Sequence, residues 1–225
     1  MKSSQHAKPA ADQIRLRITE IFYSLQGEAR TAGIPTIFIR LTGCPLRCGY
    51  CDTSYAFQGG EWWTLAKILE YLQKFKTRYI TVTGGEPLAQ KACIELLTAL
   101  CNENYEVSLE TSGALDVSQV DPRVSKVMDI KTPGSGEDDK NLFSNIEHLS
   151  RHDQVKFVLC DRNDYDWAVS VLNQYQLTSR TEVLFSPCYG QLELKQLAEW
   201  VLQDQLPVRV QTQLHKLIWG NEPGK

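Results

Sequence analysis

The chain has 225 residues, of which 42% are hydrophobic and 23% are charged. This composition is typical of a globular protein and excludes a mainly disordered chain. Its 24 basic and 27 acidic residues give a formal net charge of −3, so the chain lacks the broad basic surface that non-specific nucleic-acid binding requires.

Residues 1–14 contain no apolar stretch of signal-peptide length. We expect them to form a flexible N-terminal tail on a cytoplasmic protein, followed by a single domain over residues 15–225. No segment has the run of about 18 apolar residues that a membrane span needs. We therefore expect neither a membrane nor a nucleic-acid partner.

Strands and helices alternate along the rest of the chain. β-Branched and aromatic residues predict strands over residues 18–25, 36–43, 78–83, 105–113, 125–132, 154–160, 182–187 and 208–213. Apolar residues at helical spacing predict helices over 64–76, 92–100, 142–149, 167–175 and 192–202. Repeated βα units indicate an α/β fold with a mainly parallel sheet and outer helices. The length is too short for a closed eightfold barrel, so we expect an incomplete TIM-like barrel of about six core strands, with its site at their C-terminal ends.

Three of the seven cysteines, Cys44, Cys48 and Cys51, form a C-x3-C-x2-C motif directly after a predicted strand. Three thiolates suit a 4Fe–4S cluster whose fourth iron is left open for a ligand that is not protein. The alternative is a structural zinc site that takes its fourth ligand from His148 or Cys188. A disulfide framework is not expected in a cytoplasmic protein. The four scattered cysteines are expected to be small buried residues: Cys93, Cys101, Cys160 and Cys188.

The cysteine motif, with Tyr50 before its last cysteine, resembles that of radical S-adenosylmethionine (SAM) enzymes. The resemblance implies that SAM chelates the open iron and that electron transfer releases a 5′-deoxyadenosyl radical. Thr83-Gly84-Gly85-Glu86-Pro87 resembles the GGEP motif that holds the methionine end of SAM in these enzymes. Two glycines let the backbone approach a zwitterion closely, and Glu86 is expected to help position its ammonium group.

Further motifs resemble one family of these enzymes, the 7-carboxy-7-deazaguanine synthases. The matching segments, from about Glu20 to Trp219, are Leu25–Glu28 (LQGE), Arg40, Cys51–Thr53 (CDT), Glu110–Gly113 (ETSG) and Gln213–Lys216 (QLHK). The resemblance implies a carbon–nitrogen lyase that contracts the ring of 6-carboxy-5,6,7,8-tetrahydropterin and expels ammonia, in the biosynthesis of queuosine and other 7-deazapurines. It also implies a homodimer and an electron donor of the flavodoxin or ferredoxin type.

The resemblance assigns substrate binding to Leu25, Gln26, Gly27, Arg40 and Thr83. Arg40 has the planar fork that binds a carboxylate through two hydrogen bonds, although an ordinary ion pair is its alternative role. Gln26 and Thr83 are expected to pair with the amide and amino edge of the pterin, which would discriminate against analogues.

The resemblance also assigns SAM and Mg²⁺ ligands. The residues expected to bind SAM are Tyr50, Asp52, Gly85, Glu86, Ser112, Lys131, Thr132, Pro133, Ser135 and Ser186. Thr53 is expected to bind Mg²⁺ through its hydroxyl, with substrate oxygens and water completing the coordination. The alternative role of Thr53 is to cap the next turn.

Two positions qualify the resemblance. Ala29 stands where the family usually has a second glycine after LQGE, so the backbone there is less permissive. His215 is as consistent with a structural histidine as with an acid–base residue, so we expect no catalytic residue beyond the cluster and cofactor ligands. Two other functions stay open: a radical SAM activating enzyme for a glycyl-radical partner, and a non-catalytic iron–sulfur protein.

Overall fold

The computed structural model describes residues 10–220, 222 and 224. Positions 1–9 of the predicted tail lie outside these described residues, and residues 11–13 form a turn before the first strand. Ile14, just before β1, already packs against the hydrophobic core. No helix in the described part of the chain is long and apolar enough to cross a membrane.

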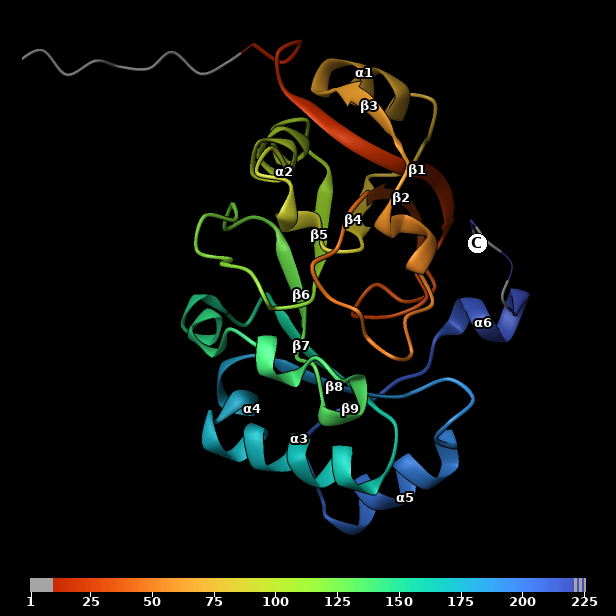
Figure 1. Ribbon diagram of the computed structural model, residues 1–225, viewed down its shortest axis with the longest axis vertical. Coiled ribbons are helices and arrows are strands. Elements are labelled where there is room, and N and C mark those ends of the chain that lie inside the picture. Colours follow the sequence, from red (N-terminus) through yellow and green to blue (C-terminus); the bar gives the residue numbers. More distant parts are fainter. Residues whose placement is uncertain (1–9, 221, 223, 225) are drawn as a thin grey trace, which may run out of the picture.

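The described strands form one sheet in the order β3-β1-β2-β4-β5-β6-β7-β8-β9 (Figure 1). Their bounds are β1 Arg15–Leu25, β2 Pro35–Leu41, β3 Glu61–Thr64, β4 Tyr79–Gly84, β5 Glu106–Thr111, β6 Ser125–Asp129, β7 Gln154–Leu159, β8 Glu182–Pro187 and β9 Arg209–Val210. Strands β2 and β4 to β9 run parallel, whereas β1 pairs antiparallel with both β2 and β3. Within the described residues β3 and β9 remain edges, so the predicted incomplete α/β barrel is confirmed.

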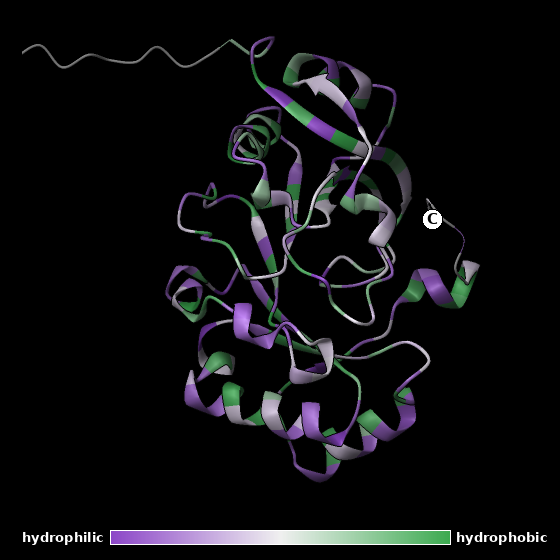
Figure 2. Ribbon diagram, viewed as in Figure 1, coloured by the Kyte–Doolittle hydropathy of each residue, from purple (hydrophilic) through white to green (hydrophobic). Residues whose placement is uncertain are grey.

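Helices cover the outside of this curved sheet. Their bounds are α1 Leu65–Leu72, α2 Cys93–Asn102, α3 Arg162–Gln174, α4 Leu177–Arg180, α5 Leu194–Gln203 and α6 Leu214–Trp219. Figure 1 shows α2 to α5 along one side of the strands, with the loop after β2 (orange) and α6 (blue) on the other. Figure 2 shows hydrophobic and hydrophilic stripes on α3 and α5, as expected for helices that bury one face against a sheet.

The core divides into two buried clusters, one on each half of the sheet. The first packs α1 and α2 on β1, β2, β4 and β5, and Ile68 and Leu97 at its centre are completely buried. The second packs α3 and α5 on β7 and β8, around Phe157 and Phe185. These two aromatic rings pack edge to face with their centroids 5.6 Å apart, a favourable geometry for aromatic pairs. Both clusters leave the C-terminal ends of the strands free to carry the site.

Two of the elements that periodicity predicts differ in the structure. Residues 142–149 form the 3-10 helix Phe143–His148 rather than an α-helix, and the predicted strand over 208–213 is reduced to the two-residue edge strand β9. Strand β3 and helix α6 were not predicted, because four and six residues are too short to show a period. Helix α6 matters most, since it brings the QLHK segment back to the site.

Candidate active site

A cavity of about 290 Å³ opens at the C-terminal ends of the parallel strands. Most of the predicted site residues line it: Leu25, Gln26, Gly27, Arg40, Cys44, Cys48, Tyr50, Cys51, Asp52, Thr53, Thr83, Gly85, Ser112, Lys131 and Ser186. Four predicted cofactor residues do not: Glu86, Thr132, Pro133 and Ser135. The residues predicted to bind SAM and those predicted to bind the substrate therefore line one cavity.

The loop after β2 presents its three cysteines to this cavity as half-buried free thiols. Burial raises the pKa of the Cys44 and Cys48 thiols, so both require a metal to become thiolates at neutral pH. The described residues gather no group of three His, Cys, Asp or Glu side chains around a single metal ion. The three cysteines line the same cavity, as the ligands of one cluster would. Of the two fourth ligands that the zinc alternative could use, Cys188 lines this cavity and His148 does not.

The loop after β4 packs directly on the cysteine loop. The backbone N–H of Glu86 donates to the carbonyl of Gly43 over 2.9 Å. A Cβ added to Gly85 would lie 2.5 Å from both Cys44 Cβ and the Gly43 oxygen. The second glycine of the motif is therefore required by contact with the cysteine loop, in addition to its predicted approach to a ligand.

Glu86 lies behind the cavity wall. Its side chain is fully buried, and its carboxylate accepts hydrogen bonds from the backbone N–H groups of Leu88 and Ser112, at 2.9 and 2.7 Å, and from the hydroxyls of Thr111 and Ser112. With these donors present, Glu86 has no face toward the cavity, whereas Ser112 lines it. Glu86 therefore holds Ser112 in place.

The loop after β6 also divides into lining and supporting residues. Thr132 is fully buried and donates to the Val158 carbonyl at 2.9 Å and to Asp164 Oδ2 at 3.0 Å. Buried Ser135 donates to the Thr132 carbonyl, and its own carbonyl accepts from Gly49 N–H at 3.0 Å. Thr132 therefore fastens this loop to β7 and α3, and Ser135 fastens it to the cysteine loop. Lys131 alone of the predicted residues here faces the cavity.

Some buried polar atoms on the cavity wall lack partners. Tyr50 Oη, Asp129 Oδ1 and Ser186 Oγ have no hydrogen-bond partner among the described residues, and all three residues line the cavity. Burial raises the pKa of Tyr50, which keeps its hydroxyl protonated as a donor. Buried polar groups normally find partners, so these atoms fit a polar ligand such as SAM.

Arg40 lies on β2 at the other side of the cavity. Its Nε donates to Glu20 Oε1 at 2.7 Å, and Glu20 Oε1 also accepts from the Tyr55 hydroxyl at 2.8 Å. The guanidinium lies 5.7 Å from the centroid of the Phe22 ring. Its two terminal nitrogens have no hydrogen-bond partner in the described chain, so the fork remains available to a ligand although Arg40 is also in an ion pair.

Gln26 follows β1 and is almost fully buried. Its Nε2 donates to Thr81 Oγ1 at 3.0 Å and to Glu110 Oε1 at 3.3 Å. Thr83 Oγ1 donates to the other Glu110 oxygen at 3.0 Å. The donors of Gln26 and Thr83 are thus directed at Glu110, and the carboxylate of Glu110 faces the cavity. Sequence reasoning missed Glu110 as a site residue, although it lies within the ETSG motif.

Asp52 and Thr53 follow the last cysteine. Thr53 Oγ1 donates to Asp52 Oδ1 at 2.7 Å, and it makes no capping hydrogen bond to the turn that it begins. Asp52 Oδ2 lies 3.0 Å from Lys216 Nζ on α6. Burial raises the pKa of Asp52, but the Thr53 hydroxyl and the Lys216 ammonium outweigh it and lower this pKa to about 2.

Helix α6 closes one wall of the cavity against the LQGE segment. Leu214 N–H donates to the Gly27 carbonyl at 2.9 Å, and a Cβ on Gly27 would lie 2.1 Å from His215 Nδ1. Burial lowers the pKa of His215, so the ring is neutral at pH 7. The packing of His215 against Gly27 thus requires a glycine at position 27. This contact gives His215 a structural role, one of the two roles that the sequence left open.

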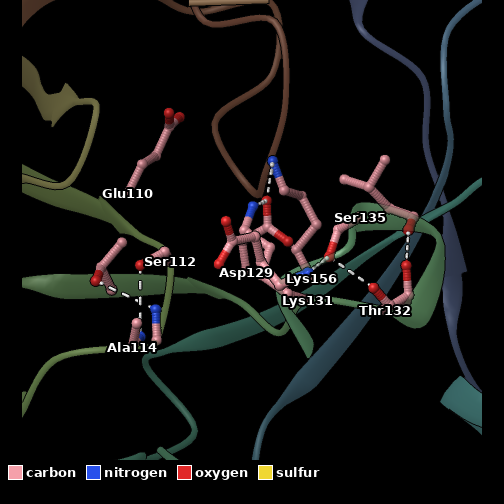
Figure 3. A network of polar contacts seen from close by, with 12 residues as sticks. Glu110, Ser112, Ala114, Asp129, Lys131, Thr132, Ser135 and Lys156 are labelled. Atoms are coloured by element: carbon pink, nitrogen blue, oxygen red, sulfur yellow. Dashed lines mark hydrogen bonds and ion pairs between the residues drawn. The ribbon is translucent and has the colours of Figure 1, made fainter. Parts of the chain in front are cut away.

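A second group of charged residues on the cavity wall was missed. Glu28, Asp129 and Lys156 line the cavity together with Lys131, and Figure 3 shows Asp129, Lys131 and Lys156 converging there. The signal was present in the sequence, because Asp129 and Lys156 are charged residues with apolar neighbours on both sides, Met128 and Ile130 for the first and Val155 and Phe157 for the second. Such residues are costly in a core unless they are paired or face a polar cavity.

Ala29 adopts a left-handed backbone conformation with φ of 62°. This is the position where the resembling family usually has glycine, and the conformation explains that preference. The methyl group of Ala29 is buried against Val127 and Leu184, which offsets part of the backbone strain.

Comparison with known proteins identifies the family of the chain. A family model of the Radical SAM superfamily matches residues 38–173. The 7-carboxy-7-deazaguanine synthase of Chlorobaculum tepidum is 44% identical over 208 residues, covering 91% of this chain and 94% of the relative. The protein of the same name from Koribacter versatilis is 39% identical over 222 residues, covering 92% of this chain and 98% of the relative.

A solved structure shares the fold. The crystal structure of QueE from Escherichia coli has a TM-score of 0.74 at 22% identity and covers 89% of this chain and 94% of its own. The family match, the two relatives over nearly their whole length and the open barrel lead to one assignment. The chain belongs to the radical SAM superfamily and, within it, to the family of 7-carboxy-7-deazaguanine synthases.

Proposed function

We propose that this protein converts 6-carboxy-5,6,7,8-tetrahydropterin to 7-carboxy-7-deazaguanine with loss of ammonia, as a step toward 7-deazapurines such as queuosine. The observation that carries the proposal is that one cavity contains both the cysteine loop and the LQGE segment with Arg40. An activating enzyme for a partner protein would need the cysteine loop but has no need of LQGE or of an enclosed arginine. A non-catalytic iron–sulfur protein would need neither the cavity nor the loop after β4.

In this proposal Cys44, Cys48 and Cys51 hold a 4Fe–4S cluster. When bound, the reduced cluster and SAM supply the 5′-deoxyadenosyl radical that starts the reaction. Gly85 and Ser112 hold the methionine end of SAM, with Glu86 fixing Ser112 from behind. The unpartnered oxygens of Asp129 and Ser186 and the donor of Tyr50 are positioned for the rest of the cofactor, beside Lys131 and Asp52.

The substrate occupies the side of the cavity between β1, β2 and β5. The terminal nitrogens of Arg40 bind its carboxylate, since a planar fork and a carboxylate match in two hydrogen bonds. Glu110 accepts from the adjacent N–H donors of the aminopyrimidinone ring, because Gln26 and Thr83 already orient both of its oxygens. Gln26 therefore acts on the ring through Glu110, together with the backbone of Leu25 and Gly27.

Mg²⁺ completes this proposal at Thr53. The Thr53 hydroxyl donates to Asp52 and keeps oxygen lone pairs available, and Mg²⁺ prefers oxygen ligands with few protein groups. The missing capping hydrogen bond favours this role over the turn-capping alternative. The ion would orient the substrate carboxylate as a template. We also propose a cytoplasmic homodimer that receives electrons from a flavodoxin or ferredoxin type of donor.

The test is a reconstitution. Anaerobically reconstituted protein, incubated with dithionite, SAM, Mg²⁺ and the carboxytetrahydropterin, should form 7-carboxy-7-deazaguanine and ammonia, measured by chromatography with mass detection. The same mixture without the pterin is the control for unproductive SAM cleavage. Cleavage of SAM at equal rates with and without the pterin, and no deazaguanine product, would refute the proposal.

A further inference from the structure

Lys156 on β7 links the LQGE segment after β1 to the end of β6. Its Nζ lies 3.2 Å from Glu28 Oε2, in the LQGE segment after β1, and 3.7 Å from Asp129 Oδ2, at the end of β6. The register pairs Asp129 with Lys156 across the two parallel strands. All three residues line the cavity, and no other described residue makes a side-chain hydrogen bond or ion pair with the Glu28 carboxylate.

The link continues on the cofactor side. Asp129 Oδ2 also lies 3.0 Å from Lys131 Nζ, so the charges alternate along Glu28, Lys156, Asp129 and Lys131. Figure 3 shows the last three of these residues side by side. The side chains of Glu28 and Lys156 are each 12% exposed. Burial lowers the pKa of Lys156, but Glu28 and Asp129 outweigh it and raise this pKa, so the ammonium stays charged. Burial also raises the pKa of Glu28, and the Lys156 ammonium opposes that rise.

A buried ion pair of this kind is a poor source of stability, because the cost of removing both charges from water cancels much of their attraction. Its geometry is strict, however, since losing one partner leaves the other buried and uncompensated. The contacts of Lys156 with Glu28 and Asp129 therefore fix the distance between the LQGE segment and the end of β6, and add little to the stability of the fold. That separation spans the cavity from the proposed substrate side to the proposed SAM side.

We propose that Lys156 is a positioning residue that holds the LQGE segment, through Glu28, at a fixed separation from the end of β6, so that the pterin and SAM keep their relative positions. This inference rests on the proposed function. Reactants must be held within about 3–3.5 Å, and a displacement of about 1 Å costs about 100-fold in rate. Loss of Lys156 should therefore let SAM be cleaved without conversion of the pterin.

The chain provides a matched control in Lys126. Its Nζ lies 3.2 Å from Asp153 Oδ1, and both side chains are more than 90% buried. The pair joins β6 to the start of β7, and Lys156 and Asp129 join the same two strands at the C-terminal end of β6. Neither Lys126 nor Asp153 lines the cavity. Removing either ammonium should destabilise the fold, but only the loss of Lys156 should separate cofactor cleavage from product formation.

The experiment compares wild type, Lys156→Met, Lys156→Arg and Lys126→Met. The first readout is the amount of 5′-deoxyadenosine released per molecule of deazaguanine formed, which we expect to rise at least about tenfold in Lys156→Met. It should stay at the wild-type value in Lys126→Met and return partly in Lys156→Arg, which keeps the charge. A wild-type ratio in Lys156→Met, or an equal rise in Lys126→Met, would overturn the inference.

A second readout needs neither cluster nor cofactor. Hydrogen exchange of the metal-free protein should be faster in the peptide over residues 26–33 for Lys156→Met and unchanged there for Lys126→Met. If Lys156→Met fails to fold, Glu28→Gln tests the same link and should raise the same ratio. Wild-type protein that forms no deazaguanine would instead refute the proposed function, and this inference with it, whatever the exchange data show.

Discussion

The two sides of the cavity are built from different kinds of contact. On the cofactor side, backbone groups join the loops: Glu86 N–H to the Gly43 carbonyl at 2.9 Å, and Gly49 N–H to the Ser135 carbonyl at 3.0 Å. On the substrate side, charged side chains join separate segments of the chain, as in Arg40 with Glu20 and Lys156 with Glu28. The cofactor side is thus specified by contiguous motifs and close packing, and the substrate side by the register of the strands.

This difference predicts different consequences of mutation. A substitution on the cofactor side should act on cluster content or stability, because it disturbs packing between backbones. A substitution on the substrate side should act on KM or on coupling, because it removes one member of a charge pair while the strands stay in place. The predictions below test that division, from the largest effect to the smallest.

The largest effect is expected for Cys48→Ala. It removes one of only three thiolate ligands, so the reconstituted protein should lose the visible absorption of the cluster, and product formation should fall to background. Cys93→Ala is the control. Cys93 is the first residue of α2 and is fully buried in the hydrophobic core, so this variant should keep the cluster. Iron and sulfide retained at the wild-type ratio in Cys48→Ala would show that Cys48 is not a ligand.

Gly85→Ala should come next. Its Cβ would lie 2.5 Å from Cys44 Cβ and from the Gly43 backbone oxygen, and neither atom can move without shifting the cysteine loop. We expect a loss of about 1–3 kcal/mol in the free energy of unfolding, as for overpacked sites, and a reduced iron content. Gly49→Ala is the control on the same loop, because its Cβ would meet only the Ser135 carbonyl oxygen at 3.9 Å. Equal iron content in both variants would contradict this account.

Arg40→Lys tests the substrate side. The change keeps the charge that pairs with Glu20 and removes the planar fork. A charge-assisted hydrogen bond is worth about 1.5–3 kcal/mol, so KM for the carboxylated pterin should rise about 10- to 100-fold with kcat and cluster content little changed. Arg78→Lys, in an exposed ion pair with Glu106, should leave KM unaltered. A wild-type KM in Arg40→Lys would leave Arg40 only its ion pair with Glu20.

The same division explains what the sequence could predict. The α/β alternation, the open barrel and the grouping of Cys44 with Gly85 follow from local patterns, so they were predicted. Glu110 and Lys156 were missed because their partners, Gln26 and Glu28, follow strand β1, and no local pattern indicates where β1 lies in the sheet. Helix α6 was missed because it is short and has no buried residue. Glu86 was assigned to the ligand because a motif does not show which of its residues lie behind the wall.

The smallest effect is expected at Ala29, directly after the LQGE segment. Its left-handed backbone, with φ of 62°, costs about 1–2 kcal/mol in an L-residue, and glycine would relieve that strain. Glycine would also give the unfolded chain about 0.4–1 kcal/mol of extra freedom and lose the methyl group buried against Val127 and Leu184, worth about 0.8 kcal/mol. These contributions nearly cancel, so Ala29→Gly should change the free energy of unfolding by less than about 0.5 kcal/mol.

Gln205→Gly separates the two contributions at Ala29. Gln205 also has a positive φ, of 50°, but its side chain is exposed, so glycine relieves the strain there without removing buried surface. Gln205→Gly should therefore stabilise the protein relative to Ala29→Gly by roughly the 0.8 kcal/mol of one buried methyl group, measured by denaturant unfolding of the metal-free protein. If Ala29→Gly were instead the more stabilising of the two, the contact with Val127 and Leu184 would contribute nothing. The preference for glycine at position 29 would then be a matter of backbone strain alone.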